Sequence, residues 1–339
     1  MRILIIGGSG LISTAITRQL VQCGENVTLY NRGKSPLRIE DKVQHIQGDR
    51  RDFAAFEKQM SDAERFDCII DMVCYTPEEA NSAVRAFSGR TGQYIFCSTV
   101  DVYTRPADGY PYYENSPRNP RSEYGKNKAH CEDIFLQAHR QGKFPVTILR
   151  PAHTYGEGGS IIHTLGWSTT YLDRIRKGKP IVVHGDGNSL WVSCHVDDVA
   201  RAFVVAAGKQ QTIGRSYHLT GEDWRSWNRY HQQVAEALGA PDPQLVHIPT
   251  ELLARIAPKR LDTTLFNFQF SNIFDNTAAR NELDFRYTVP WLDGVRRTVA
   301  WLDEHNRIEN SDNDPFDDQV ISAWQRLSTQ MIQELEGLA

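Results

Sequence analysis

A glycine-rich turn near the start of the chain constrains the fold more than any other feature. Residues 2–6 form a short apolar run, Gly7-Gly-Ser-Gly10 follows, and Ile12, Ile16 and Leu20 lie on one face of the next helical pattern. Glycines let the backbone turn tightly and approach a pyrophosphate, and a helix N-terminus supplies amide donors. This strand–turn–helix order predicts a nucleotide-binding α/β domain, and the alternative is a plain tight turn.

Strand and helix patterns then alternate along the first 150 residues. Apolar runs predict strands at residues 27–30, 43–46, 68–71, 94–97 and 146–149, with helical patterns between them. Such alternation predicts a parallel sheet with helices on both faces, and the continuous apolar runs fit strands buried on both faces. We therefore predict an α/β chain: a Rossmann-type doubly wound parallel sheet with a smaller C-terminal α/β substrate domain.

The regular alternation breaks after Pro151, which suggests a second domain. We expect residues 1–153 plus about 193–219 to form the dinucleotide-binding domain. Residues of about 154–192 and 220–339 would then form the substrate-binding domain with C-terminal helices. Within it, residues 290–304 and 321–335 have helical patterns, and the acidic stretch 309–318 between them resembles a solvated linker.

Composition excludes several classes of function. The 339 residues carry a net charge of −4 with both signs interspersed, so neither a nucleic acid nor an anionic membrane is expected as a partner. No apolar run approaches the roughly 18 residues of a membrane span, and the first residues lack a signal-peptide pattern. The six cysteines show no C-x-x-C spacing. We expect reduced thiols, no metal site and a cytoplasmic location.

Tyr124 and Lys128 form the most informative pair outside the glycine turn. They stand four residues apart at the start of a helical pattern, so both side chains lie on one face. A neighbouring ammonium favours the phenolate and lowers the tyrosine pKa from about 10. The pair is therefore a candidate proton-transfer group, although such a pair also occurs on solvated helix faces.

The end of the second strand bears on the choice of cofactor. It reads Tyr30-Asn31-Arg32-Gly33-Lys34, with two cations and no carboxylate. An acidic residue here would bind the 2′-hydroxyl of NAD, whereas an arginine suits the 2′-phosphate of NADP. The pattern favours NADP over NAD; alternatively, both cations are exposed loop charges.

In this order the motifs resemble those of the extended short-chain dehydrogenase/reductases, of the NAD-dependent epimerase/dehydratase type. The resemblance covers roughly residues 1–240. Besides the glycine turn and the Tyr124–Lys128 pair, it rests on Gly48-Asp49-Arg50, Cys97-Ser-Thr-Val-Asp-Val-Tyr103, Arg150-Pro151…Tyr155-Gly156 and His195-Val-Asp-Asp-Val199.

The resemblance implies hydride transfer at a carbinol. Tyr124 would exchange the hydroxyl proton, Lys128 would hold the nicotinamide ribose, and Thr99 would bind the substrate oxygen. Ser98 is a neighbour that could share the role of Thr99. The implied cofactor contacts are Gly7, Gly10, Leu11, Ile12, Asn31, Arg32, Asp49, Arg50, Tyr124 and Lys128. Family analogy also implies a homodimer.

Three departures from the family pattern leave the reaction open. Leu190-Trp191 replaces an arginine that clamps a diphosphate, so Trp191 is a candidate sugar platform or a core residue. His153 replaces an asparagine, so it is a second acid/base near neutrality or only a hydrogen-bonding group. Asp101 stands where dehydratases carry a glutamate base, and otherwise accepts loop amides. The candidate substrate contacts are Ser98, Thr99, Tyr103, His153 and Trp191.

The sequence therefore predicts an NAD(P)-dependent epimerase, dehydratase or dehydrogenase acting on a sugar-like or nucleotide-linked substrate. The alternative is a dinucleotide-dependent regulatory or RNA-binding protein of the same fold. Some chloroplast stem-loop RNA-binding members share a similar Asn31-Arg-Gly-Lys34 tip. The acidic balance argues against RNA, and so does the joint presence of Thr99, Tyr124 and Lys128.

Overall fold

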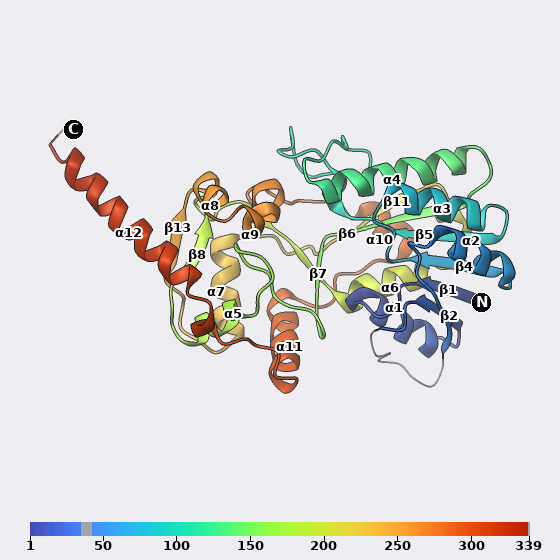
Figure 1. Ribbon diagram of the computed structural model, residues 1–339, viewed down its shortest axis with the longest axis horizontal. Helices are drawn as coiled ribbons and strands as arrows, with labels where there is room; N and C mark the ends of the chain where they lie inside the picture. Colours follow the sequence, from blue (N-terminus) through green and yellow to red (C-terminus); the bar gives the residue numbers. More distant parts are fainter. Residues whose placement is uncertain (35–42, 338–339) are drawn as a thin grey trace. The chain divides into compact units, whose positions relative to one another are not determined.

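The computed structural model describes residues 1–34 and 43–337, and the chain divides into two compact units (Figure 1). Unit 1 consists of Met1–Tyr155, Val192–Asp223 and Ile273–Val289. Unit 2 consists of Gly156–Trp191, Trp224–Asn272 and Pro290–Ala339. Each unit is described by itself below.

Unit 1 is built around a seven-stranded parallel sheet, which confirms the predicted Rossmann-type fold. The strand order is β11-β6-β5-β4-β1-β2-β3. The strands are β1 (Arg2–Ile6), β2 (Asn26–Asn31), β3 (Val43–Gln47), β4 (Phe66–Asp71), β5 (Thr91–Cys97), β6 (Val146–Pro151) and β11 (Ser216–Leu219). The order reverses between β1 and β4. Ligands of such sheets bind beside the carboxyl ends of the strands at this reversal.

Helices cover both faces of this sheet because successive strand residues point to opposite sides. Ile3 and Ile5 belong to one apolar cluster, and Leu4 and Ile6 belong to the other. In Figure 1, α1 (Leu11–Gln22) and α6 (Val196–Ala206) lie below the strands, while α2 (Phe53–Asp62), α3 (Pro77–Phe87) and α4 (Glu123–Arg140) lie above them. The burial of apolar residues on both faces of the sheet explains why helices cover both faces.

Two helices of unit 1 begin at side-chain caps that the sequence encodes. The Thr76 hydroxyl accepts a hydrogen bond from the Glu79 amide while the Glu79 carboxylate accepts from the Thr76 amide, and Pro77 occupies the first turn of α3. The Ser122 hydroxyl accepts from the Gly125 amide at the start of α4. These caps fix where α3 and α4 begin, next to the carboxyl ends of β4 and β5.

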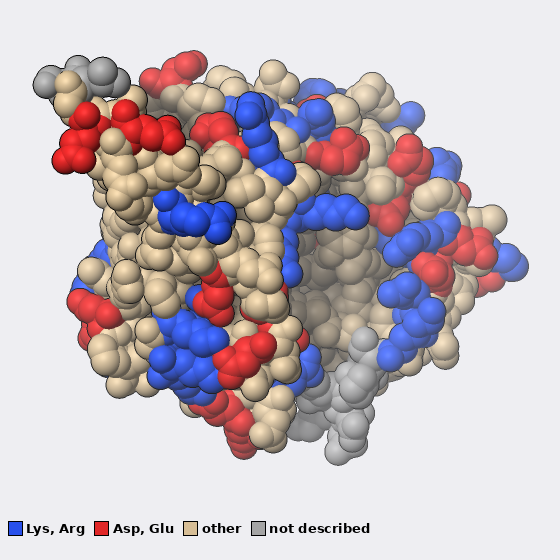
Figure 2. Space-filling model, turned by 60° about the vertical axis from the view of Figure 1, so that its left-hand side comes forward, with Lys and Arg blue, Asp and Glu red and all other residues tan. Residues whose placement is uncertain are grey.

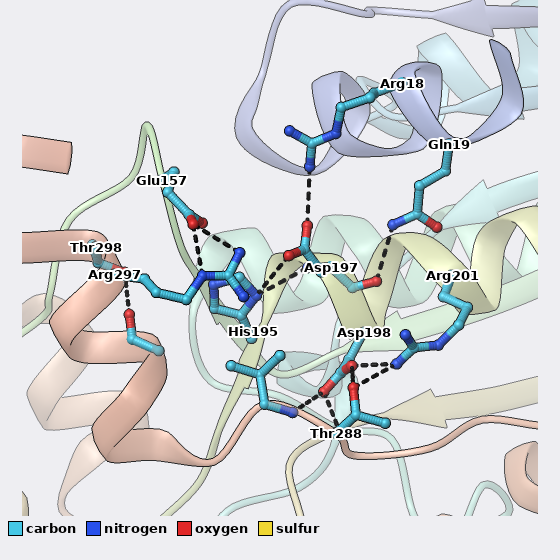
Figure 3. Close-up of polar contacts among 12 residues, drawn as sticks. Arg18, Gln19, Glu157, His195, Asp197, Asp198, Arg201, Thr288, Arg297 and Thr298 are labelled. Carbon is cyan, nitrogen blue, oxygen red and sulfur yellow. Dashed lines mark hydrogen bonds and ion pairs between the residues drawn. The ribbon is translucent and has the colours of Figure 1, made fainter. Parts of the chain in front are cut away.

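Residues 273–289 belong to unit 1, whereas we had expected all of 220–339 in the second domain. The buried carboxylate of Asp198 on α6 accepts hydrogen bonds from the amides of Thr288 and Val289, from the Thr288 hydroxyl at 2.5 Å and from Arg201 (Figure 3). Leu283, at the end of α10 (Thr277–Leu283), lies in the core of the same face. The sequence analysis missed this segment because its partners lie about 90 residues earlier.

Unit 2 combines short strands with helices. β8 (Ile181–His184) pairs in parallel with β13 (Leu245–Ile248), and β9 (Leu190–Trp191) pairs antiparallel with β12 (Arg225–Ser226). Its helices are α5 (Thr170–Arg176), α7 (Trp227–Ala237), α8 (Thr250–Ile256), α9 (Pro258–Thr263), α11 (Trp291–Glu304) and α12 (Phe316–Leu335). β7 (His153–Tyr155) and β10 (Ser193–His195) form a further parallel pair, within unit 1.

Helix α12 is packed only along its first turns. Val320 and Ile321 are buried in an apolar cluster of unit 2, whereas Leu327, Met331 and Leu335 are more than half exposed. The helix begins at Phe316, so it includes the end of the stretch that we had read as a linker.

None of the helices in the described ranges combines the length and apolar content needed to cross a membrane. Basic and acidic side chains are mixed over the face shown in Figure 2, as expected from the interspersed charges of the sequence.

Candidate functional site

A pocket of about 190 Å³ lies at the carboxyl ends of the strands of unit 1. It is lined by residues at or just after the carboxyl ends of four neighbouring strands: Ile6, Gly7 and Ser9; Tyr30, Asn31, Arg32 and Lys34; Gly48, Asp49, Arg50 and Arg51; and Val73, Tyr75 and Glu79. These strands flank the reversal of the sheet. The pocket therefore stands where a dinucleotide binds in doubly wound folds.

The glycine turn has the backbone geometry that only glycine adopts without strain. Gly7 and Gly8 have φ of 117° and 95°. A Cβ atom on Gly8 would lie 3.0 Å from the Leu29 side chain. Ser13, at the third small position of the motif, accepts a hydrogen bond from the Gly10 amide at 2.9 Å. The serine thus preserves the turn, and the cradle of backbone amides fits a pyrophosphate.

Leu11 and Ile12 form the first positions of α1, and their side chains pack against the core of the sheet. The N-terminus of α1 therefore presents its backbone amides, and not these side chains, to an anion.

The tip of β2 presents cations to the same pocket. Arg32 and Lys34 line it and are exposed, and neither forms an ion pair within residues 1–34 and 43–337. The Asn31 side chain turns back to accept from the Gly33 amide at 2.8 Å, which orders the tip. Residues 30–34 contain no carboxylate that would repel the 2′-phosphate of NADP.

Asp49 and Arg50 have different positions after β3. Asp49 lies at the pocket and accepts from the Arg51 amide at 3.0 Å. Arg50, predicted as a cofactor contact, lines the pocket, and its buried guanidinium pairs with Asp71 and donates to the Glu79 carbonyl at 2.7 Å. It supports the floor of the pocket through these bonds.

Thr99, Tyr124 and Lys128 meet where β5 ends and α4 begins. The Thr99 hydroxyl accepts from the Asp101 amide at 3.2 Å, and its interaction with the Tyr124 hydroxyl lowers the pKa of that phenol. Gly125 explains the close approach, because a Cβ atom there would lie 2.5 Å from the Asp101 carbonyl oxygen. Gly125 was not predicted as a site residue, because its only signal in the sequence is a glycine inside a helical pattern.

Lys128 is 2% exposed and is held by backbone carbonyls. Its Nζ donates to the carbonyl oxygens of Cys97 at 2.8 Å and Cys74 at 2.9 Å. An ammonium has three N–H donors, so one remains for a ligand. Nζ lies 5.9 Å from the centre of the Tyr124 ring.

The pKa of Tyr124 is raised, so the expected lowering by Lys128 is wrong. The side chain keeps 44% of its surface exposed, but burial around its hydroxyl raises the pKa, and the Asp101 carboxylate acts in the same direction. The hydrogen bond with Thr99 opposes them. The Lys128 ammonium binds the carbonyls of Cys74 and Cys97 and is not among the groups that set the pKa of Tyr124.

Asp101 lies beside this group. Burial raises the pKa of its carboxyl, and Arg105, 3.6 Å away, acts in the opposite direction. The carboxyl also acts electrostatically on Tyr124, where its negative charge raises the pKa of the phenol.

Of the two roles considered for His153, the structure favours the hydrogen-bonding group over an acid/base that titrates near neutrality. Burial lowers its pKa to about 3, so the imidazole is neutral. Its Nδ1 lies 2.9 Å from the Ser193 hydroxyl across the β7–β10 pair. His153 thus acts as a hydrogen-bonding group in this structure.

Ser98, Tyr103 and Trp191 are buried. The Ser98 hydroxyl donates to Glu132 at 2.6 Å, and the Tyr103 hydroxyl accepts from Arg150 at 2.7 Å. Trp191, in unit 2, packs on Trp227 and Phe268. Glu132 is the residue that sequence reasoning missed here, because a single carboxylate in a helical pattern carries no local signal of burial.

Comparison with known proteins agrees with this geometry. A family model described as the NAD dependent epimerase/dehydratase family matches residues 3–219.

The chain belongs to the NAD-dependent epimerase/dehydratase family.

Two relatives of this chain have names that describe different functions. The chloroplast stem-loop binding protein of 41 kDa b from Arabidopsis thaliana is 30% identical over 259 residues, which cover 73% of this chain and 65% of that protein. This chain thus spans less than two thirds of that relative. The 2′-dehydrokanamycin reductase of Streptomyces kanamyceticus is 28% identical over 255 residues, covering 75% of this chain and 71% of that protein.

A solved structure of the same fold is the dTDP-glucose 4,6-dehydratase of Bacillus anthracis in complex with NAD. It superimposes with a TM-score of 0.72 at 17% identity and covers 90% of this chain and 97% of that one. This likeness shows a shared fold. Family membership and the sequence relatives identify the chain as an NAD-dependent enzyme of the short-chain dehydrogenase/reductase type.

Proposed function

We propose that this enzyme catalyses hydride transfer at a carbinol of a sugar-like or nucleotide-linked substrate, with Tyr124 as the acid/base. The observation that carries the proposal is the meeting of Thr99, Tyr124 and Lys128 at the end of β5. All three belong to unit 1, as does the pocket at the glycine turn.

The residues present fit a nicotinamide dinucleotide. Gly7 and Gly10 would hold its pyrophosphate, Asn31 and Arg32 its adenosine ribose, and Asp49 its adenine. When bound, the dinucleotide supplies the hydride acceptor or donor. Arg32 and Lys34 line the pocket as cations that could bind the negatively charged 2′-phosphate of NADP, which supports NADP as the cofactor. A solved structure of the same fold contains NAD.

Each catalytic side chain has a separate task. Thr99 would donate to the substrate oxygen and hold it in place. Tyr124 would accept the hydroxyl proton during oxidation and return it during reduction. Lys128 would use its third N–H on a ribose hydroxyl of the dinucleotide.

The role of Asp101 decides which of the possible reactions the enzyme catalyses. As a base it would remove the proton α to a transient ketone, which leads to elimination or epimerisation with the hydride returned in the same cycle. Without that role the net reaction is a simple oxidation or reduction. The raised pKa of its carboxyl, caused by burial, and its position beside Tyr124 support the first course.

The test uses purified enzyme with NAD, NADP and a panel of sugar nucleotides and aminoglycosides. We expect dinucleotide binding and a substrate-dependent change at the nicotinamide absorbance band. Tyr124→Phe should lower kcat by at least about 100-fold, as for the loss of a general acid/base. Tyr113→Phe is the matched control, an exposed tyrosine of the same unit. Full activity of Tyr124→Phe would contradict the assignment.

A second candidate function is RNA binding, which the Arabidopsis relative favours. A filter-binding assay with a stem-loop RNA in the presence and absence of dinucleotide tests it. RNA binding at physiological salt that persists in Tyr124→Phe would support this candidate over catalysis. The homodimer and the cytoplasmic location that we expect are tested by light scattering and by cell fractionation.

A further inference from the structure

Tyr75 lies between the dinucleotide pocket and the catalytic pair. It follows β4, lines the same pocket as Gly7 and Arg32, and is 47% exposed. Its backbone amide donates to the Glu79 carboxylate at 2.5 Å, and its hydroxyl donates to the Met72 carbonyl at 3.5 Å. An exposed aromatic ring is thus held at a defined place beside a nucleotide pocket.

The ring of Tyr75 also faces the Lys128 ammonium. Nζ lies 4.8 Å from the centre of the Tyr75 ring and 4.8 Å from that of Phe96. Within residues 1–34 and 43–337, Lys128 has no carboxylate in ion-pair contact. A buried cation without a counter-ion needs other compensation. Two carbonyls and the electron-rich faces of aromatic rings provide it here.

We propose that Tyr75 is a positioning residue for Lys128, acting through its ring face on the ammonium. The proposal rests on the proposed function, because it assigns to Lys128 a contact with the bound dinucleotide. Phe96 is buried in the core and belongs to the fixed frame of the sheet. Tyr75 is exposed to the pocket, so its ring links pocket and ammonium in one contact.

This placement has a chemical consequence. The carbonyls of Cys74 and Cys97 take two of the three ammonium donors, and the ring of Tyr75 limits where Nζ can move. The third donor is then held ready for a ribose hydroxyl before the dinucleotide binds. Such preorganisation increases affinity because less freedom is lost on binding.

The test measures dinucleotide affinity by quenching or enhancement of fluorescence with NADH and NADPH. Tyr75→Leu removes the ring face while retaining an apolar side chain, and we expect about 2- to 30-fold weaker binding. Tyr75→Phe retains the face and should bind like the wild type. Tyr113 is similarly exposed and has no ring contact to Lys128 in the described structure. The Tyr113→Leu variant should therefore also bind like the wild type.

A double-mutant cycle with Lys128→Met distinguishes positioning from a direct contact. If Tyr75 acts through Lys128, Tyr75→Leu should weaken binding no further in the Lys128→Met background. Additive losses would overturn the inference, as would wild-type affinity of Tyr75→Leu or an equal loss in Tyr75→Phe. Melting temperatures matched to wild type confirm that the variants are folded. A wild-type protein that binds no dinucleotide would instead overturn the proposed function.

Discussion

Arg150 and Glu132 form a buried bidentate ion pair in unit 1. Arg150 Nε lies 2.8 Å from Glu132 Oε1, and Nη2 lies 2.7 Å from Oε2. Ser98 donates to the same carboxylate, so the pair joins β6, α4 and the end of β5. Removing one partner leaves an uncompensated buried charge, and we expect Glu132→Gln to lower the free energy of unfolding by about 3–5 kcal/mol.

Urea denaturation followed by circular dichroism measures this change. Glu334→Gln is the control, because Glu334 is exposed near the end of α12 and its loss should cost less than about 0.5 kcal/mol. Equal stability of Glu132→Gln and wild type would show that the pair contributes no net stability.

Asp101 should set the pH dependence of the oxidation. A raised pKa of Tyr124 means that the phenolate is scarce at neutral pH, so kcat/KM for oxidation should rise as pH increases into the alkaline range. Asp101→Asn removes a negative charge that opposes phenolate formation, and the rise should move to lower pH. A pH–rate profile in the oxidative direction checks this, and an unmoved profile would contradict the coupling.

His153 should contribute to acid sensitivity. Its pKa is lowered to about 3 by burial, against about 6.5 in the unfolded chain. Between these values the unfolded state binds more protons, so stability falls as pH decreases from about 6.5 toward 3. His153→Asn should reduce this loss, while His130→Asn, at an exposed position, should not. Urea midpoints at pH 7 and pH 5 give the comparison.

Arg32 should decide how well the site accepts a 2′-phosphate. Loss of a charge-assisted bond in Arg32→Ala is expected to weaken NADP binding about 10-fold or more and leave NAD binding nearly unchanged. Calorimetric titration with both dinucleotides measures the ratio, with Lys259→Ala as a control for general loss of charge. Equal NADP affinity in wild type and Arg32→Ala would remove this role.

Helix α12 should respond very differently at its two ends. Ile321 is buried, so Ile321→Ala is expected to cost about 2–4 kcal/mol of stability. Leu327 is 54% exposed, so Leu327→Ala should cost less than about 1 kcal/mol. Chemical denaturation of both variants tests the contrast. A large cost at Leu327 would show that another surface covers this part of the helix in solution.

Local signals in the sequence were enough for the framework of unit 1. Apolar runs indicated β1 to β6, and the caps at Thr76 and Ser122 are encoded within four residues. Long-range relationships were not accessible. The bonds of Asp198 to Thr288, the ion pair of Glu132 with Arg150 and the ring of Tyr75 over Lys128 each join residues that are at least 18 positions apart.

The electrostatics of the site were also beyond local pattern. Spacing placed Tyr124 and Lys128 on one helix face, but Nζ is bound by the carbonyls of Cys74, in the segment after β4, and of Cys97, at the end of β5. The neutral state of His153 likewise follows from burial, which the type of residue does not reveal.

The three-segment construction of unit 1 has a consequence for biosynthesis. Its sheet receives β11 only after residue 219 has been made, and the bonds of Asp198 on α6 to Thr288 and Val289 form only after Thr288 emerges from the ribosome. Until then the apolar face that Leu283 and Phe285 later cover is open. A nascent chain stalled before that point would present this face to chaperones, and its release should depend on the last fifth of translation.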